Sequence, residues 1–120
     1  MKPIEPLLLD DTISLKTVNG IEILHSSDII YCCIKNREVV IVLLNGQTKR
    51  VLHSLTELEG IFTPFHFYRY HAKSLINIAH IKLYNHKMST LRLSNDIELK
   101  VASDRKVKFK QMIYRKILPT

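Results

Sequence analysis

The chain has 120 residues, enough for one domain with a hydrophobic core and too few for two. Its 46% hydrophobic and 24% charged residues, with three glycines and four prolines, exclude a largely disordered or low-complexity chain. The purely apolar run from Val39 to Leu44, which no other run exceeds, is far shorter than the roughly twenty residues of a membrane-spanning helix. No signal-peptide core is present at the start, so we expect a cytoplasmic protein.

The formal net charge of +7 is unevenly distributed along the chain. Residues 1–60 carry 6 basic and 8 acidic side chains, whereas residues 61–120 carry 12 basic and 3 acidic ones. Such a basic half is a candidate surface for a polyanion such as nucleic acid. A merely solvated basic surface would give the same totals.

The first half of the chain reads as short strands joined by tight turns. Asn-Gly between β-type segments is the strongest short-range hairpin signal, and it occurs at Asn19-Gly20 and at Asn45-Gly46. We expect strands at Ile13 to Val18, Ile21 to Leu24, Ile29 to Ile34, Val39 to Leu44 and Thr48 to Leu52.

A short helix is predicted next, from Ser54 to about Phe62. Leu55, Leu58 and Phe62 have helical spacing. Ser54 and Glu57 stand in the relation of a capping box, in which the serine oxygen accepts from the amide three residues on and the glutamate bonds back.

The segment from Phe67 to Asn77 is predicted as a strand. Arg69, His71 and Lys73 occupy every second position of an apolar run, so on one strand they would share a face. The tyrosines between them, Tyr68 and Tyr70, would then face the core rather than stack on bases.

More strands are predicted after this segment, among them Thr90 to Leu93 and Ile97 to Val101 around an Asn95-Asp96 turn. A C-terminal helix is predicted to follow, with Ser103 as its N-cap. Its apolar face would consist of Phe109, Met112, Ile113 and Ile117. The predicted fold is therefore mainly β: one domain of small packed antiparallel sheets with one short internal helix and a C-terminal helix.

Catalysis and metal binding find little support in the sequence. There is no glycine-rich phosphate loop, and acidic residues are scarce in the second half. The six histidines lack the spacing of metal ligands, so we predict no enzyme, no metal and no cofactor. Cys32 and Cys33 are neighbours that would point to opposite faces of a strand, which leaves a buried hydrophobic role or a redox-responsive thiol open.

Three cationic clusters remain: Lys35-Asn36-Arg37, the Arg69 to Lys73 segment, and Ser103 to Lys108. Each alone would ordinarily be solvated surface. Together they offer cations for phosphates, Arg and Asn side chains for base edges, and a helix N-terminus for a phosphate.

The order of motifs resembles the LytTR DNA-binding domain from about Thr12 to Ile113. The segments that carry the resemblance are "DIIYCCIKNREVVIVLLNGQTKRVLHSLTELEG", "FYRYHAKSLINIAHI" and "LRLSNDIELKVASDRK". The matching positions are Asp28-Ile29-Ile30-Tyr31, Ser54-Leu55, Leu58-Glu59, Tyr68-Arg69, His71, Ile76-Asn77, Ser103, Arg105 and Lys106.

The resemblance implies a module of about ten strands that binds promoter DNA as the output domain of a bacterial response regulator in a two-component system, commonly on paired direct repeats. By position it implies DNA contacts from three segments. They are Lys35, Asn36 and Arg37; His71, Ala72 and Lys73; and Ser103, Arg105, Lys106 and Lys108.

Two positions depart from the family pattern. The residue after the histidine is ordinarily basic, whereas here Ala72 comes first and Lys73 second, so Lys73 would act from a shifted position. Asp104 stands where many members are basic, and it would either repel phosphate or cap the helix and orient Arg105.

Residues 1–11 are expected to be an N-terminal segment and residues 12–120 the LytTR-like domain. A receiver domain would precede such a module in a response regulator, so the chain would be either an excised output domain or a free-standing member.

The first hypothesis is sequence-specific binding of double-stranded DNA in transcriptional regulation, with Asn36, Arg37, Lys73 and Arg105 on base edges and two copies on DNA. The alternative is a protein-interaction module whose basic face docks an acidic partner or pairs with a DNA-binding relative. Its affinity for duplex DNA would be absent or insensitive to salt.

Overall fold

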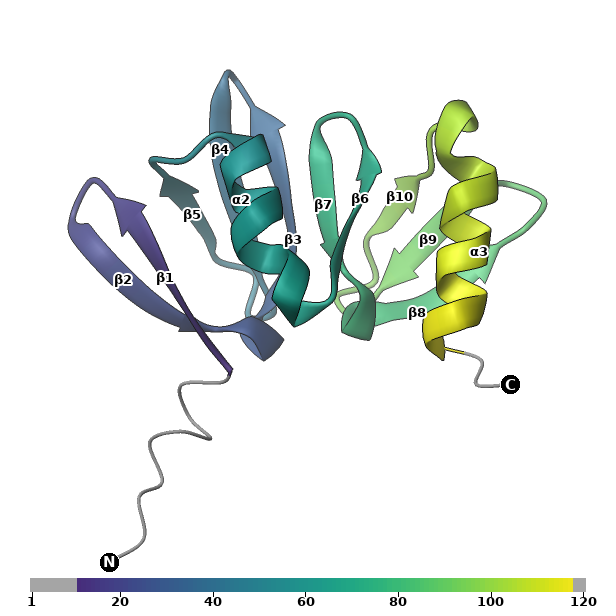
Figure 1. Ribbon diagram of the computed structural model, residues 1–120, viewed down its shortest axis with the longest axis horizontal. Helices are drawn as coiled ribbons and strands as arrows, with labels where there is room; N and C mark the ends of the chain where they lie inside the picture. Colours follow the sequence, from purple (N-terminus) through teal and green to yellow (C-terminus); the bar gives the residue numbers. More distant parts are fainter. Residues whose placement is uncertain (1–10, 118–120) are drawn as a thin grey trace, which may run out of the picture.

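Ten short strands form three small antiparallel sheets in the computed structural model, which describes residues 11–117 (Figure 1). The strands are β1 Thr12–Thr17, β2 Gly20–His25, β3 Ile29–Lys35, β4 Glu38–Leu43, β5 Thr48–Val51, β6 Phe67–His71, β7 Ser74–Asn77, β8 Ile81–Asn85, β9 Thr90–Leu93 and β10 Glu98–Lys100. The helices are α2 Leu55–Phe62 and α3 Lys106–Ile117. The mainly β prediction with two helices is confirmed.

The first sheet is the hairpin of β1 and β2. Its turn is centred on Val18 and Asn19, because Thr17 pairs with Gly20. Gly20 has φ +124°, a conformation that favours glycine. The predicted hairpin is thus confirmed, although its glycine follows the turn instead of lying at its centre.

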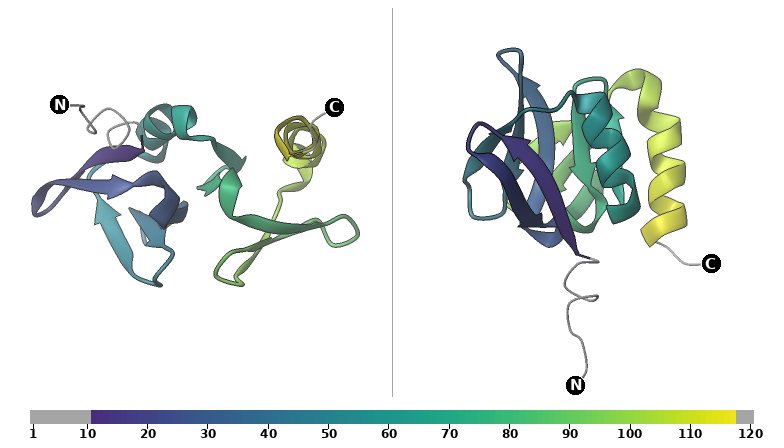
Figure 2. Two further views of the ribbon diagram at one scale, coloured as in Figure 1. Left: turned by 90° about the horizontal axis from the view of Figure 1, so that it is seen from below. Right: turned by 60° about the vertical axis from the view of Figure 1, so that its left-hand side comes forward.

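The central sheet has five strands in the order β5-β4-β3-β7-β6. Neighbouring residues of its inner strands face opposite sides, so Ile29 and Leu75 enter one core while Ile30 and Ile76 enter another. The central sheet is therefore the shared wall of two cores. The first core is covered by α2 and by the β1–β2 hairpin, and the second is covered by the third sheet and α3 (Figures 1 and 2).

Helix α2 begins as the sequence predicts. The amide of Glu57 donates to Ser54 Oγ at 3.0 Å, and the amide of Ser54 donates to Glu57 Oε1 at 2.8 Å. This capping box satisfies amides that the first turn of a helix leaves unpaired, and the same bonds lower the pKa of the Glu57 carboxyl. Leu55, Leu58 and Phe62 are buried, as their spacing predicts.

The prediction of one strand from Phe67 to Asn77 is wrong. The chain reverses at Ala72 and Lys73, and His71 pairs with Ser74 across a hairpin. The pairing register also shifts between Tyr68 and His71, which is typical of a β-bulge. Period-2 alternation cannot reveal such a reversal, because no glycine, proline or Asn-Gly pair signals it.

The third sheet has the order β10-β9-β8 and packs against α3 through Leu91, Leu93 and Phe109. The rings of Tyr68 and Tyr84 lie 5.8 and 5.5 Å from that of Phe109. The core assignment of Tyr68 is thus confirmed. Tyr70 is buried in the same core, as predicted, and burial raises the pKa of its hydroxyl to about 12.

Ser103 does not cap α3. A single 3-10 turn, Ser103–Arg105, precedes the helix, and its N-cap is Ala102, without a side-chain cap. Ser103 is therefore already inside the helical segment, and the Asp104 side chain provides no cap either. Phe109 and Ile113 are buried and Met112 packs beside them, as predicted, whereas the side chain of Ile117 lies outside the described residues.

Candidate nucleic-acid interface

The three cationic segments lie along one edge of the molecule. The β3–β4 turn, the β6–β7 turn and the start of α3 all stand at the upper edge in Figure 1, and the second panel of Figure 2 places them at the same end. This follows from topology, because β3 and β6 both run toward that edge and α3 begins there. Segments separated by some thirty residues in the sequence thereby become neighbours along one rim.

The first segment is a two-residue turn without glycine. Lys35 pairs with Glu38, and the residues between them, Asn36 and Arg37, have φ of 53° and 66°. Two positive φ values are typical of a type I′ turn, whose second position ordinarily favours glycine. Lys35, Asn36 and Arg37 are all exposed, so the turn presents an amide and two cations to solvent.

The second segment, the turn between β6 and β7, is bonded to the neighbouring strand β3. The amide of Ile34 donates to the carbonyl of Lys73 at 3.0 Å, and the amide of Lys73 donates to His71 Nδ1 at 3.1 Å. In a neutral His71 the proton therefore resides on Nε2. Ala72 and Lys73 are exposed, and His71 is half-buried.

The third segment surrounds the first turn of α3. Ser103 and Lys108 are exposed, whereas Arg105 and Lys106 are partly buried. Arg105 Nη1 donates to the carbonyl of Arg69 at 3.0 Å, which ties this turn to β6. One guanidinium donor is thus committed to the fold, and a guanidinium has five.

Arginine side chains divide into two groups by their partners. Among the five whose side chains are described, three form ion pairs, at Arg50–Glu38, Arg69–Glu59 and Arg92–Glu98, and of these only Arg69 belongs to a cationic segment. The other two, Arg37 and Arg105, form none within the described part of the chain. The same is true there of the segments' lysines, Lys35, Lys73, Lys106 and Lys108. This edge therefore keeps its positive charge uncompensated.

Arg69 was predicted to share a cationic face with His71 and Lys73, but its side chain is turned to the protein. It contacts Glu59 at 3.0 Å and the carbonyl of Ala72 at 2.6 Å. The sequence contains both Leu58-Glu59 and Tyr68-Arg69, yet spacing alone gives no sign that the two motifs meet.

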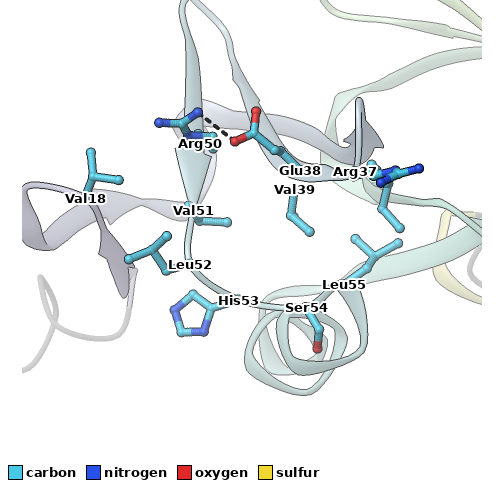
Figure 3. A pocket seen from close by; sticks show the side chains of 11 residues that line it. Val18, Arg37, Glu38, Val39, Arg50, Val51, Leu52, His53, Ser54 and Leu55 are labelled. Carbon is cyan, nitrogen blue, oxygen red and sulfur yellow. Dashed lines mark hydrogen bonds and ion pairs between the residues drawn. The ribbon is translucent and has the colours of Figure 1, made fainter.

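A pocket lies beside the first segment, between β5 and the start of α2 (Figure 3). Its volume is about 640 Å³, and Val18 and Leu52 contribute to a largely apolar wall. His53 and Ser54 also line it, but His53 Nε2 accepts from the amide of Lys16 and Ser54 Oγ caps α2. Neither is arranged as a nucleophile with its base.

The two cysteines are free, with Cys32 buried and Cys33 half-buried on β3. Burial raises the pKa of both thiols, which disfavours the reactive thiolate. No cluster of three or more His, Cys, Asp or Glu side chains suited to a metal occurs in the part of the chain that the structure describes. None of its helices is long and apolar enough to cross a membrane.

The family model of the LytTr DNA-binding domain matches residues 19–114. The chain belongs to the LytTR DNA-binding domain family. LytTR domains are DNA-binding modules without enzymatic activity.

A LytTr DNA-binding domain from Bacillus cereus, from a protein described as a methyl-accepting/DNA response regulator, has the same fold. Its TM-score is 0.72 at 24% identity, and the alignment covers 86% of this chain and 96% of that one. A search of curated proteins gave no match.

Proposed function

We propose that this LytTR domain binds double-stranded DNA sequence-specifically and regulates transcription as the output module of a response regulator or as a free-standing regulator. The observation that carries the proposal is the shared edge: three separate segments, each with uncompensated cations, lie on one rim of a domain whose family binds DNA. Phosphates attract such cations, and each phosphate contact releases condensed counterions.

The dimensions of the molecule support contact with successive grooves. The longest principal dimension is 49 Å, and the rim runs along that axis. That dimension includes the β1–β2 hairpin and the β8–β9 loop, which extend past the three segments in Figure 1, and it exceeds one turn of B-DNA, about 34 Å. The β3–β4 turn and the start of α3 stand at opposite sides of the β6–β7 turn, which suits them to different grooves.

Each segment has side chains for reading bases and side chains for phosphates. Asn36 suits adenine, and Arg37 and Arg105 suit guanine, since these pairs form bidentate hydrogen bonds in the major groove. Lys73, which is exposed in the β6–β7 turn, would contact a base edge. The remaining cationic and polar contacts would fix the register on the duplex through phosphates, namely Lys35, His71, Ser103, Lys106 and Lys108. The methyl group of Ala72 suits a thymine methyl.

Selection from a random duplex pool, followed by fluorescence anisotropy over a salt series, tests the proposal. We expect an enriched sequence motif, paired as direct repeats with two copies bound, and affinity that falls steeply with salt. Stoichiometry at saturation measures the number of copies. Enrichment of no motif, together with absent binding at low salt, would contradict the proposal.

A protein-interaction role is the second candidate, because the β1–β2 hairpin exposes several apolar side chains. Val18, Ile21 and Ile23 of the β1–β2 hairpin are 64%, 71% and 67% exposed. Exposed apolar side chains in a cluster are typical of docking surfaces. A flat salt response in the same titration would favour this role over DNA binding.

A further inference from the structure

Arg69 occupies an unusual place among the arginines of the chain. Its side chain is 21% exposed, and it extends from β6 beneath the β6–β7 turn. Nε and Nη2 both donate to the carbonyl of Ala72, at 3.2 and 2.6 Å. One edge of the guanidinium therefore bonds a single carbonyl, at the tip of the second segment.

The opposite part of the guanidinium is fixed by helix α2. Nη1 donates to Glu59 Oε1 at 3.0 Å and lies 3.4 Å from Thr56 Oγ1. A charge-assisted bond to a carboxylate is stronger than a neutral one, and a planar guanidinium transmits the orientation set at one edge to the other. The helix therefore determines where the turn carrying Ala72 and Lys73 can lie.

The main chain of the same residue contacts the third segment. The Arg69 carbonyl accepts from Arg105 Nη1 at 3.0 Å. Arg69 thus contacts the second segment with its side chain and the third with its backbone. Between α2 and α3 these residues border a cleft of about 370 Å³, lined also by Phe67, Tyr68 and Lys108.

We propose that Arg69 is a positioning residue that sets the second DNA-contacting segment relative to the third, without itself contacting DNA. The inference rests on the proposed function. Its physical basis is that β3 holds the β6–β7 turn on the β7 side only, through the bond from the Ile34 amide to the Lys73 carbonyl, whereas the β6 side has a bulge. Pairing therefore leaves the orientation of the β6 side of the turn, with the exposed Ala72, to other contacts. The bonds to Ala72 and Glu59 supply that orientation.

Arg69→Gln and Arg69→Lys test the inference. Gln removes the charge, and Lys keeps it but lacks the planar pair of donors that bonds the Ala72 carbonyl. Arg92→Gln is the matched control, because Arg92 is also ion-paired, with Glu98, but lies in β9 away from the rim. Lys106→Ala serves as the reference for a lost phosphate contact.

Affinity for the selected site and for a scrambled duplex is measured at several salt concentrations. We expect both Arg69 variants to lower the ratio of specific to scrambled affinity at least tenfold, while the salt slope stays equal to that of Arg92→Gln. Rescue by Lys, or a slope reduced as in Lys106→Ala, would mean that Arg69 acts through its charge on a phosphate and would overturn the inference. An unchanged ratio would overturn it as well.

Two further measurements keep the outcomes separate. If the unaltered chain selects no site, the proposed function fails first and the inference fails with it. If Arg69→Gln does not fold, Glu59→Gln keeps Arg69 but removes the carboxylate that orients it, and a loss of discrimination at unchanged salt slope is again expected. Hydrogen exchange in residues 70–74 should be faster in the Glu59 variant than in Arg92→Gln, and equal rates would count against the inference.

Discussion

The turns at the two ends of strand β4 both need a residue with positive φ, and they use different residue types for it. At the end away from the rim, β4 is followed by Leu44, Asn45 and Gly46, and Gly46 takes φ +89°. At the rim end, β4 is preceded by Asn36 and Arg37, and an arginine takes φ +66°. A non-glycine residue in the left-handed region costs on the order of 1 kcal/mol, so the rim turn is the less favourable one.

The difference indicates that the residues of the β3–β4 turn are not the ones that would make this turn most stable. A glycine at position 37 would ease the turn but would remove a cation that no described carboxylate neutralises. Arg50 and Arg92, which lie on strands away from the three turns, are ion-paired, whereas Arg37 and Arg105 form no ion pair within the described residues. Strain and uncompensated charge coincide at functional sites more often than elsewhere.

Replacing Arg105 by Ala should have the largest effect on the rim. If Arg105 reads a guanine, the variant loses about 1–3 kcal/mol of binding free energy and relaxes the preference at one base pair. Anisotropy against the selected site and its single-base variants measures both changes. Binding as tight as that of the unaltered chain would remove Arg105 from the base-reading set.

Single substitutions in the turns at the two ends of β4 should change the free energy of unfolding in opposite directions. Gly46→Ala should destabilise by about 1–2 kcal/mol, since an added Cβ meets no atom within 4 Å and backbone strain is the main cost. Arg37→Gly should stabilise by up to about 1 kcal/mol and weaken DNA binding. Urea denaturation measures the first quantity and anisotropy the second. A destabilised Arg37→Gly would show that the turn is not strained.

A smaller effect is expected from single lysines. Lys106→Ala should reduce the slope of log affinity against log salt by about 0.9 and weaken all sequences alike. Lys82→Ala, which removes an exposed lysine paired with Asp96 at 3.2 Å, should leave the slope unchanged. Equal slopes for the two variants would mean that the rim lysine contacts no phosphate.

The smallest effect near neutral pH is expected from Tyr70, through the pH dependence of the free energy of unfolding. Burial raises the pKa of Tyr70 to about 12 from an ordinary value of 10, so the folded state favours the neutral phenol. Its contribution is complete below pH 10 and is lost as pH rises through 12. Tyr70→Phe should lose less stability between pH 10 and 12 than the unaltered chain, measured by urea denaturation at each pH. An identical pH profile would show that another group governs alkaline unfolding.

Most of the fold could be predicted because its signals are local. Hairpins around Asn19-Gly20 and Asn45-Gly46, and the capping box of Ser54 and Glu57, depend on residues within a few positions of one another. The β6–β7 reversal could not be predicted, because Ala72 and Lys73 have no strong turn preference and the reversal is set by pairing of β7 with the distant β3.

The residues that make up the candidate site could be predicted from the sequence, but the hydrogen bonds and ion pairs that join its segments could not. The three cationic segments were evident in the sequence, and their residues' DNA contacts remain a prediction. The bond from Arg105 to the Arg69 carbonyl joins residues 36 positions apart, and the ion pair of Arg69 with Glu59 joins residues 10 apart. Such contacts depend on how α2, β6 and α3 pack, which no periodicity records.

The central sheet's two-sided burial has a consequence for folding. Adjacent residues of β3, Ile29 and Ile30, belong to different cores, and so do Leu75 and Ile76 of β7. A slip of either strand by one residue would exchange every inward group with its neighbour and spoil both cores at once. We therefore expect the molecule to unfold in one cooperative transition. Neither core should unfold while the other keeps its DNA-contacting turns in place.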